Sequence, residues 1–101
     1  MTDDAVATLV REMHELLDVG PVGLYEFMWE LNGSQPSMPD AERLCVAQTA
    51  LDRILSEPDV QLIWRNWADA STLRRADRGE LSPTAFANIP DDGIFLAIDR
   101  L

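Results

Sequence analysis

The sequence predicts an α+β fold in which three helices precede a two-stranded antiparallel β-ribbon. Apolar residues recur every three or four positions through the first half of the chain, a spacing typical of amphipathic helices. The period changes to two over residues 60–67, and a second short apolar run follows at 94–98, which favours two paired strands. With 101 residues, 47% of them hydrophobic, the chain is expected to form one core and a single domain over residues 1–101.

The first helix is expected to start at the capping and acidic residues Thr2 to Asp4 and to end at Gly20-Pro21. Its apolar stripe consists of Val6, Leu9, Val10, Met13, Leu16 and Leu17. A second helix is expected to begin at Pro21, a favoured first helical position, and to end at Asn32-Gly33. It has so few polar residues that we expect it in the middle of the fold, with Tyr25 and Trp29 in the core or at its edge.

The third helix is expected to run from about Met38 to Leu55. Ser37 and Asp40 fit a capping box at its start, and Pro58 prevents its continuation. Cys45 lies in the middle of this helix and is expected to be a small buried thiol. As the single cysteine, it excludes an internal disulfide and a cysteine-based zinc site.

The two strands are separated by about 25 residues, which is long for a hairpin loop. A turn at Asp91-Asp92-Gly93 is expected to introduce the second strand. Ser82-Pro83 is typical of the start of a short helix through Ala87, anchored by Phe86. The remaining residues, 69–80, are polar and expected to be mobile.

Charge restricts the class of partner. The chain has 18 acidic and 8 basic side chains, and the net charge is −10. Nucleic acids and anionic membranes would be repelled by the field of the whole molecule, so a basic partner or no charged partner is favoured. The acidity is equally compatible with a role in solubility alone. No apolar run reaches the roughly 20 residues that span a bilayer, and the acidic N-terminus is unlike a signal peptide, so we expect a cytoplasmic protein.

Motifs of catalysis are absent from the sequence. There is no nucleophile elbow, no glycine-rich phosphate loop and no zinc-protease helix. Residues 69–80 have acidic ends like a calcium loop, but Arg74 stands where such a loop needs glycine. We therefore expect a non-enzymatic protein without cofactor or metal.

The order of helix, helix, helix, strand, long connection and strand resembles the winged helix-turn-helix domain. Residues 50–64, ALDRILSEPDVQLIW, look like the end of a recognition helix running into the first wing strand, as in many small bacterial regulators. The resemblance implies DNA contact through the third helix and the wing. Here, however, the exposed positions expected on that helix include four acids and two arginines, which would oppose contact with phosphates.

Two functions remain open. In the first, a winged-helix-like interaction module binds a basic protein surface. Its candidate contact residues are Glu26, Trp29, Glu30, Asp40, Glu42 and Asp52. In the second, a transcriptional regulator contacts DNA through an arginine-rich wing. The candidate contacts of that wing are Arg65, Arg74, Arg75 and Arg78.

Trp64 and Trp67 are three residues apart, which places them on opposite faces of a strand. One is expected in the core and the other outside. An outward tryptophan is compatible with a homodimer contact and equally with packing under the long connection.

Overall fold

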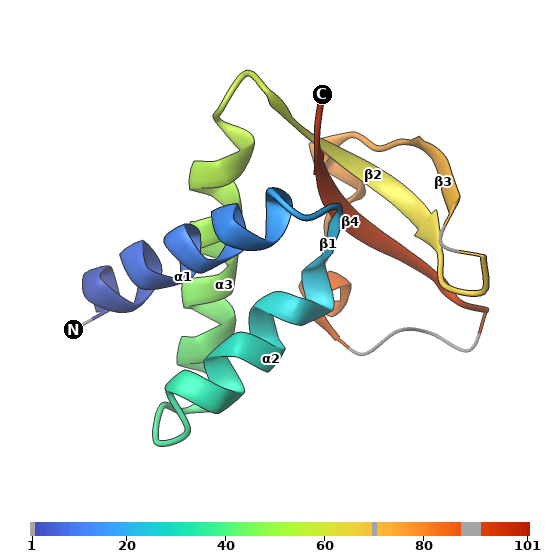
Figure 1. Cartoon of the computed structure of the whole chain (residues 1–101). Coiled ribbons are helices and arrows are strands. Elements are labelled where there is room, and N and C mark those ends of the chain that lie inside the picture. The colour runs from blue at the N-terminus through green and yellow to red at the C-terminus, as the bar shows by residue number, and fades with distance from the viewer. Residues whose placement is uncertain (1, 70, 88–91) are drawn as a thin grey trace.

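The computed structural model describes residues 2–69, 71–87 and 92–101, and its fold is α+β (Figure 1). The helices are α1 (Thr2–Leu17), α2 (Leu24–Ser34) and α3 (Asp40–Leu55), with short 3-10 turns η1 (Arg78–Glu80) and η2 (Pro83–Phe86). The strands are β1 (Val22–Gly23), β2 (Val60–Asn66), β3 (Ser71–Arg75) and β4 (Ile94–Arg100). Figure 1 shows the three helices gathered on one side and the sheet on the other.

The sheet is antiparallel, with the strand order β1-β4-β2-β3. The predicted pairing of the two apolar strands is confirmed: β2 and β4 pair along their whole length, from Val60 opposite Arg100 to Asn66 opposite Ile94. The predicted two-stranded ribbon is wrong, because β1 adds to β4 and β3 adds to β2. A two-residue strand is too short to show a period, and β3 is mostly exposed, so neither strand has an alternating apolar pattern.

The hydrophobic core lies between the helices and one face of the sheet. Fully buried side chains come from all three helices and from β4, among them Leu9, Phe27, Ile54 and Ile98. Because side chains alternate along a strand, Leu96 and Ile98 of β4 face the helices and Ala97 between them faces away. The same alternation separates the tryptophans as predicted: Trp64 packs against the core, whereas Trp67 is exposed.

The beginnings of two helices differ from the prediction. Pro21 does not start α2, because Val22 and Gly23 are drawn into the sheet and the helix begins at Leu24. The carboxylate of Glu26 accepts a hydrogen bond from the Gly23 backbone N–H at 2.6 Å and so satisfies a donor at this helix start. No side chain caps α3, so the expected capping box at Ser37 is absent.

Two further expectations are corrected by packing. Cys45 is exposed, because the buried stripe of α3 runs through its neighbour Val46 and through Ala50 and Ile54. The segment 69–80 was expected to be a mobile connection, but its described part contains β3 and η1. The backbone of β3 pairs with β2, and η1 is a local turn. The expected short helix is present as η2, and Phe86 is its buried anchor.

Phe86 offers a test of this packing. Its ring lies 5.9 Å from the Phe27 ring, centroid to centroid, and joins the long connection to the core. We expect Phe86→Ala to lower the free energy of unfolding by about 3 kcal/mol, since a buried aromatic side chain would leave a cavity. Leu73→Ala, which truncates an exposed side chain on β3, is expected to change it by less than about 0.5 kcal/mol. Equal urea midpoints for the two variants would contradict the anchoring role.

Candidate interaction surfaces

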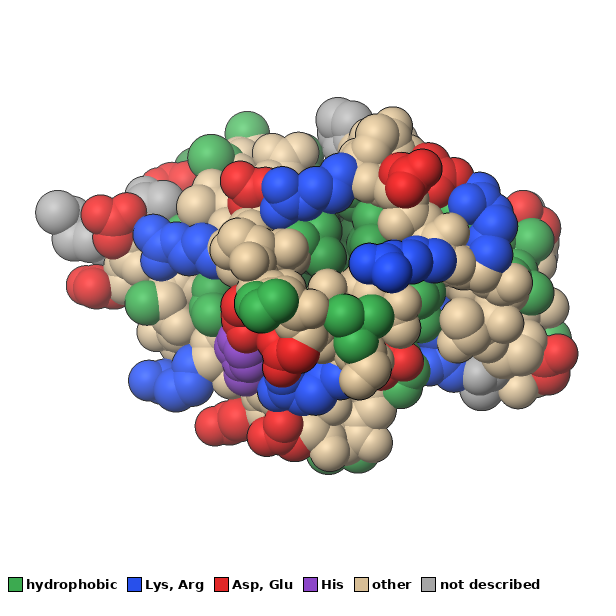
Figure 2. Space-filling view, turned by 90° about the horizontal axis from the view of Figure 1, so that it is seen from above, with side chains coloured by type: hydrophobic (Ala, Val, Ile, Leu, Met, Phe, Trp, Pro, Cys, Tyr) green, Lys and Arg blue, Asp and Glu red, His purple; other side chains and the backbone are tan. Residues whose placement is uncertain are grey.

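The six acidic and aromatic residues predicted to bind a partner do not form one patch. Asp40 pairs with Arg43 within α3, and Asp52 pairs with Arg78 at 3.1 Å. Glu26 is engaged at the start of α2 by the Gly23 N–H. Figure 2 shows blue and red side chains interleaved over the face it displays, with hydrophobic side chains at the bottom of a hollow near its middle.

Trp29 and Asp40 are brought together at a shallow groove between α2, α3 and η2. The groove has a volume of about 650 Å³. Met28, Leu44 and Phe86 supply its apolar side chains, and Asn32 and Asp40 supply its polar ones. Trp29 stands at its edge with 55% of its surface exposed, so the expectation that it packs in or near the core is wrong. Glu42 is exposed in the first turn of α3 but does not line the groove.

Glu30 is held against α1 and contributes to an acidic pair. A side-chain hydrogen bond with Glu30, together with burial and the nearby negative charge, raises the pKa of Glu12 to about 7. Two carboxyl groups that share a hydrogen bond must hold at least one proton between them. The pair therefore carries less negative charge below neutral pH than the sequence suggests.

The arginines predicted for the DNA-binding wing are mostly engaged within the protein. Arg74 donates to Glu80 at 3.2 Å and lies 5.8 Å from the Trp64 ring. The hydrogen bond from Arg74 lowers the pKa of Glu80 to about 2, with help from the Asp77 N–H. Arg78 reaches both the carboxylate and the backbone carbonyl of Asp52. Among the described residues Arg75 has no side-chain partner, and it is exposed.

A set of four aromatic rings, which the sequence did not bring together, joins α2 to the sheet. Tyr25 contacts Trp29, Phe95 and Trp67, with ring centroids 4.7, 5.5 and 6.3 Å away. Burial raises the pKa of the Tyr25 phenol above its ordinary value, and the charge of Glu26 raises it further. The sequence signal that could have indicated this set is the period of two, which places Arg65 and Trp67 on one face of the strand. Phe95 is the cross-strand neighbour of Arg65 on that face.

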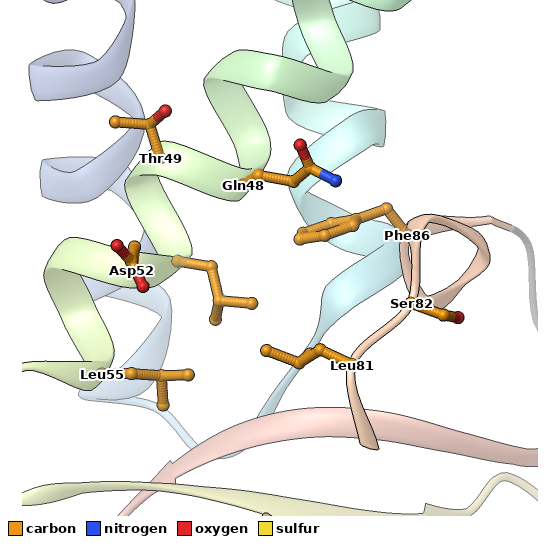
Figure 3. Close-up of a pocket in the computed structure, with 8 residues that line it drawn as sticks. Gln48, Thr49, Asp52, Leu55, Leu81, Ser82 and Phe86 are labelled. Atoms are coloured by element: carbon orange, nitrogen blue, oxygen red, sulfur yellow. The ribbon is translucent and has the colours of Figure 1, made fainter. Parts of the chain in front are cut away.

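A second groove runs beside α3, where the connection between β3 and β4 passes over the helix. Its volume is about 390 Å³. Figure 3 shows Leu81 and Phe86 extending from the connection toward α3, with Gln48 and Asp52 on the helix. The groove combines five residues of α3 with three of the connection, so no local pattern in the sequence could reveal it.

The described residues contain no group of three or more His, Cys, Asp and Glu side chains that could hold a metal ion. His14, the purple residue in Figure 2, hydrogen-bonds to Glu57 at 2.7 Å instead. None of the helices within the described ranges is long and apolar enough to cross a membrane.

No family model, curated protein or solved structure matches the chain. The surfaces must therefore be interpreted from their own geometry and chemistry.

The acidic pair of α1 and α2 predicts a pH-dependent stability. Because the pKa of Glu12 is raised from 4.5 to about 7 in the folded state, its stabilising contribution is complete below pH 4.5. It is lost as the pH rises through about 7, since the folded protein then releases a proton that it held more tightly than the unfolded chain. Urea unfolding between pH 4.5 and 8 should show this decrease in the wild type and a flatter profile in Glu12→Gln.

Glu15→Gln is the matched control on the same helix, and it is expected to retain most of the dependence because Glu15 contributes least among the causes of the Glu12 shift. A profile that is as steep in Glu12→Gln as in the wild type would contradict the shared proton.

Proposed function

We propose that the chain is a non-enzymatic protein-interaction module that binds a basic protein partner in the groove between α2 and α3. The observation that carries the proposal is Trp29, which is more than half exposed at the edge of this groove. Tryptophan contributes strongly to protein interfaces because it buries a large apolar ring and keeps a hydrogen-bond donor at its edge.

The surroundings of Trp29 support this role. Its ring rests against Tyr25 in an edge-to-face contact at 4.7 Å, so the side chain is partly ordered before a partner arrives. Less conformational entropy is then lost on binding. Met28 and Leu44 are half buried beside it and offer apolar contact area for a partner side chain.

Charge supports a basic partner. The net charge of −10 would speed association with a positively charged surface. Asp40 lines the groove, and Glu42 lies exposed in the same helical turn. We therefore propose Trp29 and Asp40 as the centre of the contact surface, with Glu42 as a further negative charge outside the groove. Glu26 lines a different cavity, and Asp52 borders the groove of Figure 3, so both fall outside it.

The winged helix-turn-helix resemblance is kept as a proposal about the fold. It is supported by the three helices and by the antiparallel strands β2 and β4 that follow them. The long connection between these two strands contains β3 and the two 3-10 turns. DNA binding through the wing is the alternative function, and exposed Arg75 favours it. It is the weaker alternative because Arg74 and Arg78 are already paired with Glu80 and Asp52.

The test is an NMR titration of the ¹⁵N-labelled protein with a synthetic amphipathic helix of leucine and lysine. We expect saturable shifts centred on Met28, Trp29, Asn32 and Leu44, and no such shifts with a leucine–glutamate helix of the same length. Trp29→Ala should weaken binding about tenfold, because interface tryptophans are frequent hot spots. Leu73→Ala, another exposed apolar truncation, should leave the affinity unchanged.

Charge reversal gives a second, matched comparison. Asp40→Arg and Glu15→Arg change the net charge equally, but only Asp40 lines the groove, so only the first should weaken binding substantially. Shifts scattered over the surface, or equal effects of the two reversals, would overturn the proposed site. Salt-dependent binding of a DNA duplex that is lost in Arg75→Ala would favour the regulator instead.

A further inference from the structure

A separate cavity of about 310 Å³ lies where α2 meets the side of the sheet that faces away from the core. Its walls include the rings of Tyr25, Trp67 and Phe95, and its polar lining comes from Glu26, Arg65 and Asn66. Phe95 and Arg65 are cross-strand neighbours on this face, and the Trp67 backbone is fixed by a hydrogen bond from its N–H to the Gly93 carbonyl at 2.7 Å. The size is sufficient for a small organic ligand.

We propose that this cavity binds a zwitterion with a quaternary ammonium group at one end and a carboxylate at the other. The three rings stand steeply to one another, at angles of 64° to 72°, with centroids 5.5 to 6.3 Å apart. Each pair of rings is in an edge-to-face arrangement, and all three rings line the same cavity. Aromatic walls of this kind attract alkylated ammonium groups through the negative charge of the ring faces, while the methyl groups gain apolar contact.

The charged side chains of the cavity explain why the ligand should carry both signs. Glu26 adds a negative charge beside the rings, and its position is held by the Gly23 N–H at 2.6 Å. Arg65 lines the same cavity and would oppose a simple cation. A guanidinium has five N–H donors, so it can donate to a ligand carboxylate while keeping its contacts within the protein. Unlike an anion, a ligand of zero net charge is not repelled at long range by the acidic molecule.

The arrangement of the rings requires glycine at position 23. A Cβ atom at this position would lie 2.3 Å from Cε1 of Tyr25 and 3.1 Å from Cε2 of Phe95. The Gly23 φ angle of −68° is open to any residue, so glycine is required here by space and not by backbone conformation. Its missing side chain lets Tyr25 and Phe95 approach each other over the backbone beside the cavity.

The proposal is tested with three small probes and NMR titration of the labelled protein. Trimethylglycine carries both charges, choline lacks the carboxylate, and 3,3-dimethylbutanoate replaces the charged nitrogen by carbon. We expect saturable shifts at the Trp67 indole and at Phe95, with trimethylglycine bound most tightly and 3,3-dimethylbutanoate at least about tenfold more weakly. Equal binding of those two would show an apolar pocket only, and the absence of saturable shifts would exclude the site.

Two substitutions test the binding of the ammonium end and the carboxylate end of the ligand separately. Trp67→Ala should weaken trimethylglycine binding at least about tenfold, while Leu73→Ala should not, because Leu73 lies on β3 and does not line the cavity. Arg65→Gln should lower the affinity for trimethylglycine toward that for choline and leave choline binding unchanged or stronger. A loss of both ligands in Arg65→Gln with an unchanged amide spectrum, or no loss of either, would overturn the assignment of Arg65 to the carboxylate. None of these measurements depends on the groove beside Trp29.

Discussion

The pairing of β2 with β4 is the interaction on which the rest of the structure depends. It joins residues 60–66 to residues 94–100, which are separated by the whole connection, through an unbroken antiparallel ladder. Both outer strands are built onto this pair: the two-residue strand β1 pairs with β4, and the mostly exposed β3 pairs with β2. One face of the pair presents Leu62, Leu96 and Ile98 to the helices and completes the core.

The same ladder creates the second face, on which the aromatic cavity is built. Each strand places alternate side chains there, so Arg65 and Phe95 meet across the pair. The first turn of α2 adds Tyr25 and Glu26, because β1 ties the start of that helix to the edge of β4. Trp29 lies one helical turn farther along, on the groove toward α3. Two surfaces of different chemistry therefore meet at Tyr25, whose ring contacts both tryptophans.

Ion pairs decide which charges remain available on the surface. Arg100 reaches Asp18 at 3.0 Å and Asp59 at 3.1 Å, and thus connects the ends of three segments. Arg74 and Arg78 are held by acids within the protein. Each exposed pair contributes little to stability. Together, however, they use much of the scarce positive charge within the protein, so acidic side chains predominate among the charges that remain.

Much of the fold could be predicted from the sequence alone. The positions of three helices and the pairing of two apolar strands follow from local periodicity, because burial of one face imposes a regular spacing. The anchoring role of Phe86 follows from the helix-start signal at Ser82-Pro83. The order of the three helices and of β2 and β4 was predicted correctly, whereas β1 and β3 were not predicted. Local pattern was misleading at Cys45, where its neighbour Val46 is buried instead, and at Val22 and Gly23, which join the sheet instead of α2. It also failed to indicate the exposure of Trp29 and the presence of β3.

The candidate sites were decided by the tertiary structure. Trp29 and Asp40 were proposed from composition and charge, but only the packing of α2 on α3 places them at one groove. The cavity of Tyr25, Trp67 and Phe95 draws on three segments, and its closure depends on the missing side chain of Gly23. Periodicity records which side of an element is buried. It does not record which segments meet, because that depends on strand pairing between residues that are 28 (Asn66 and Ile94) to 40 (Val60 and Arg100) positions apart.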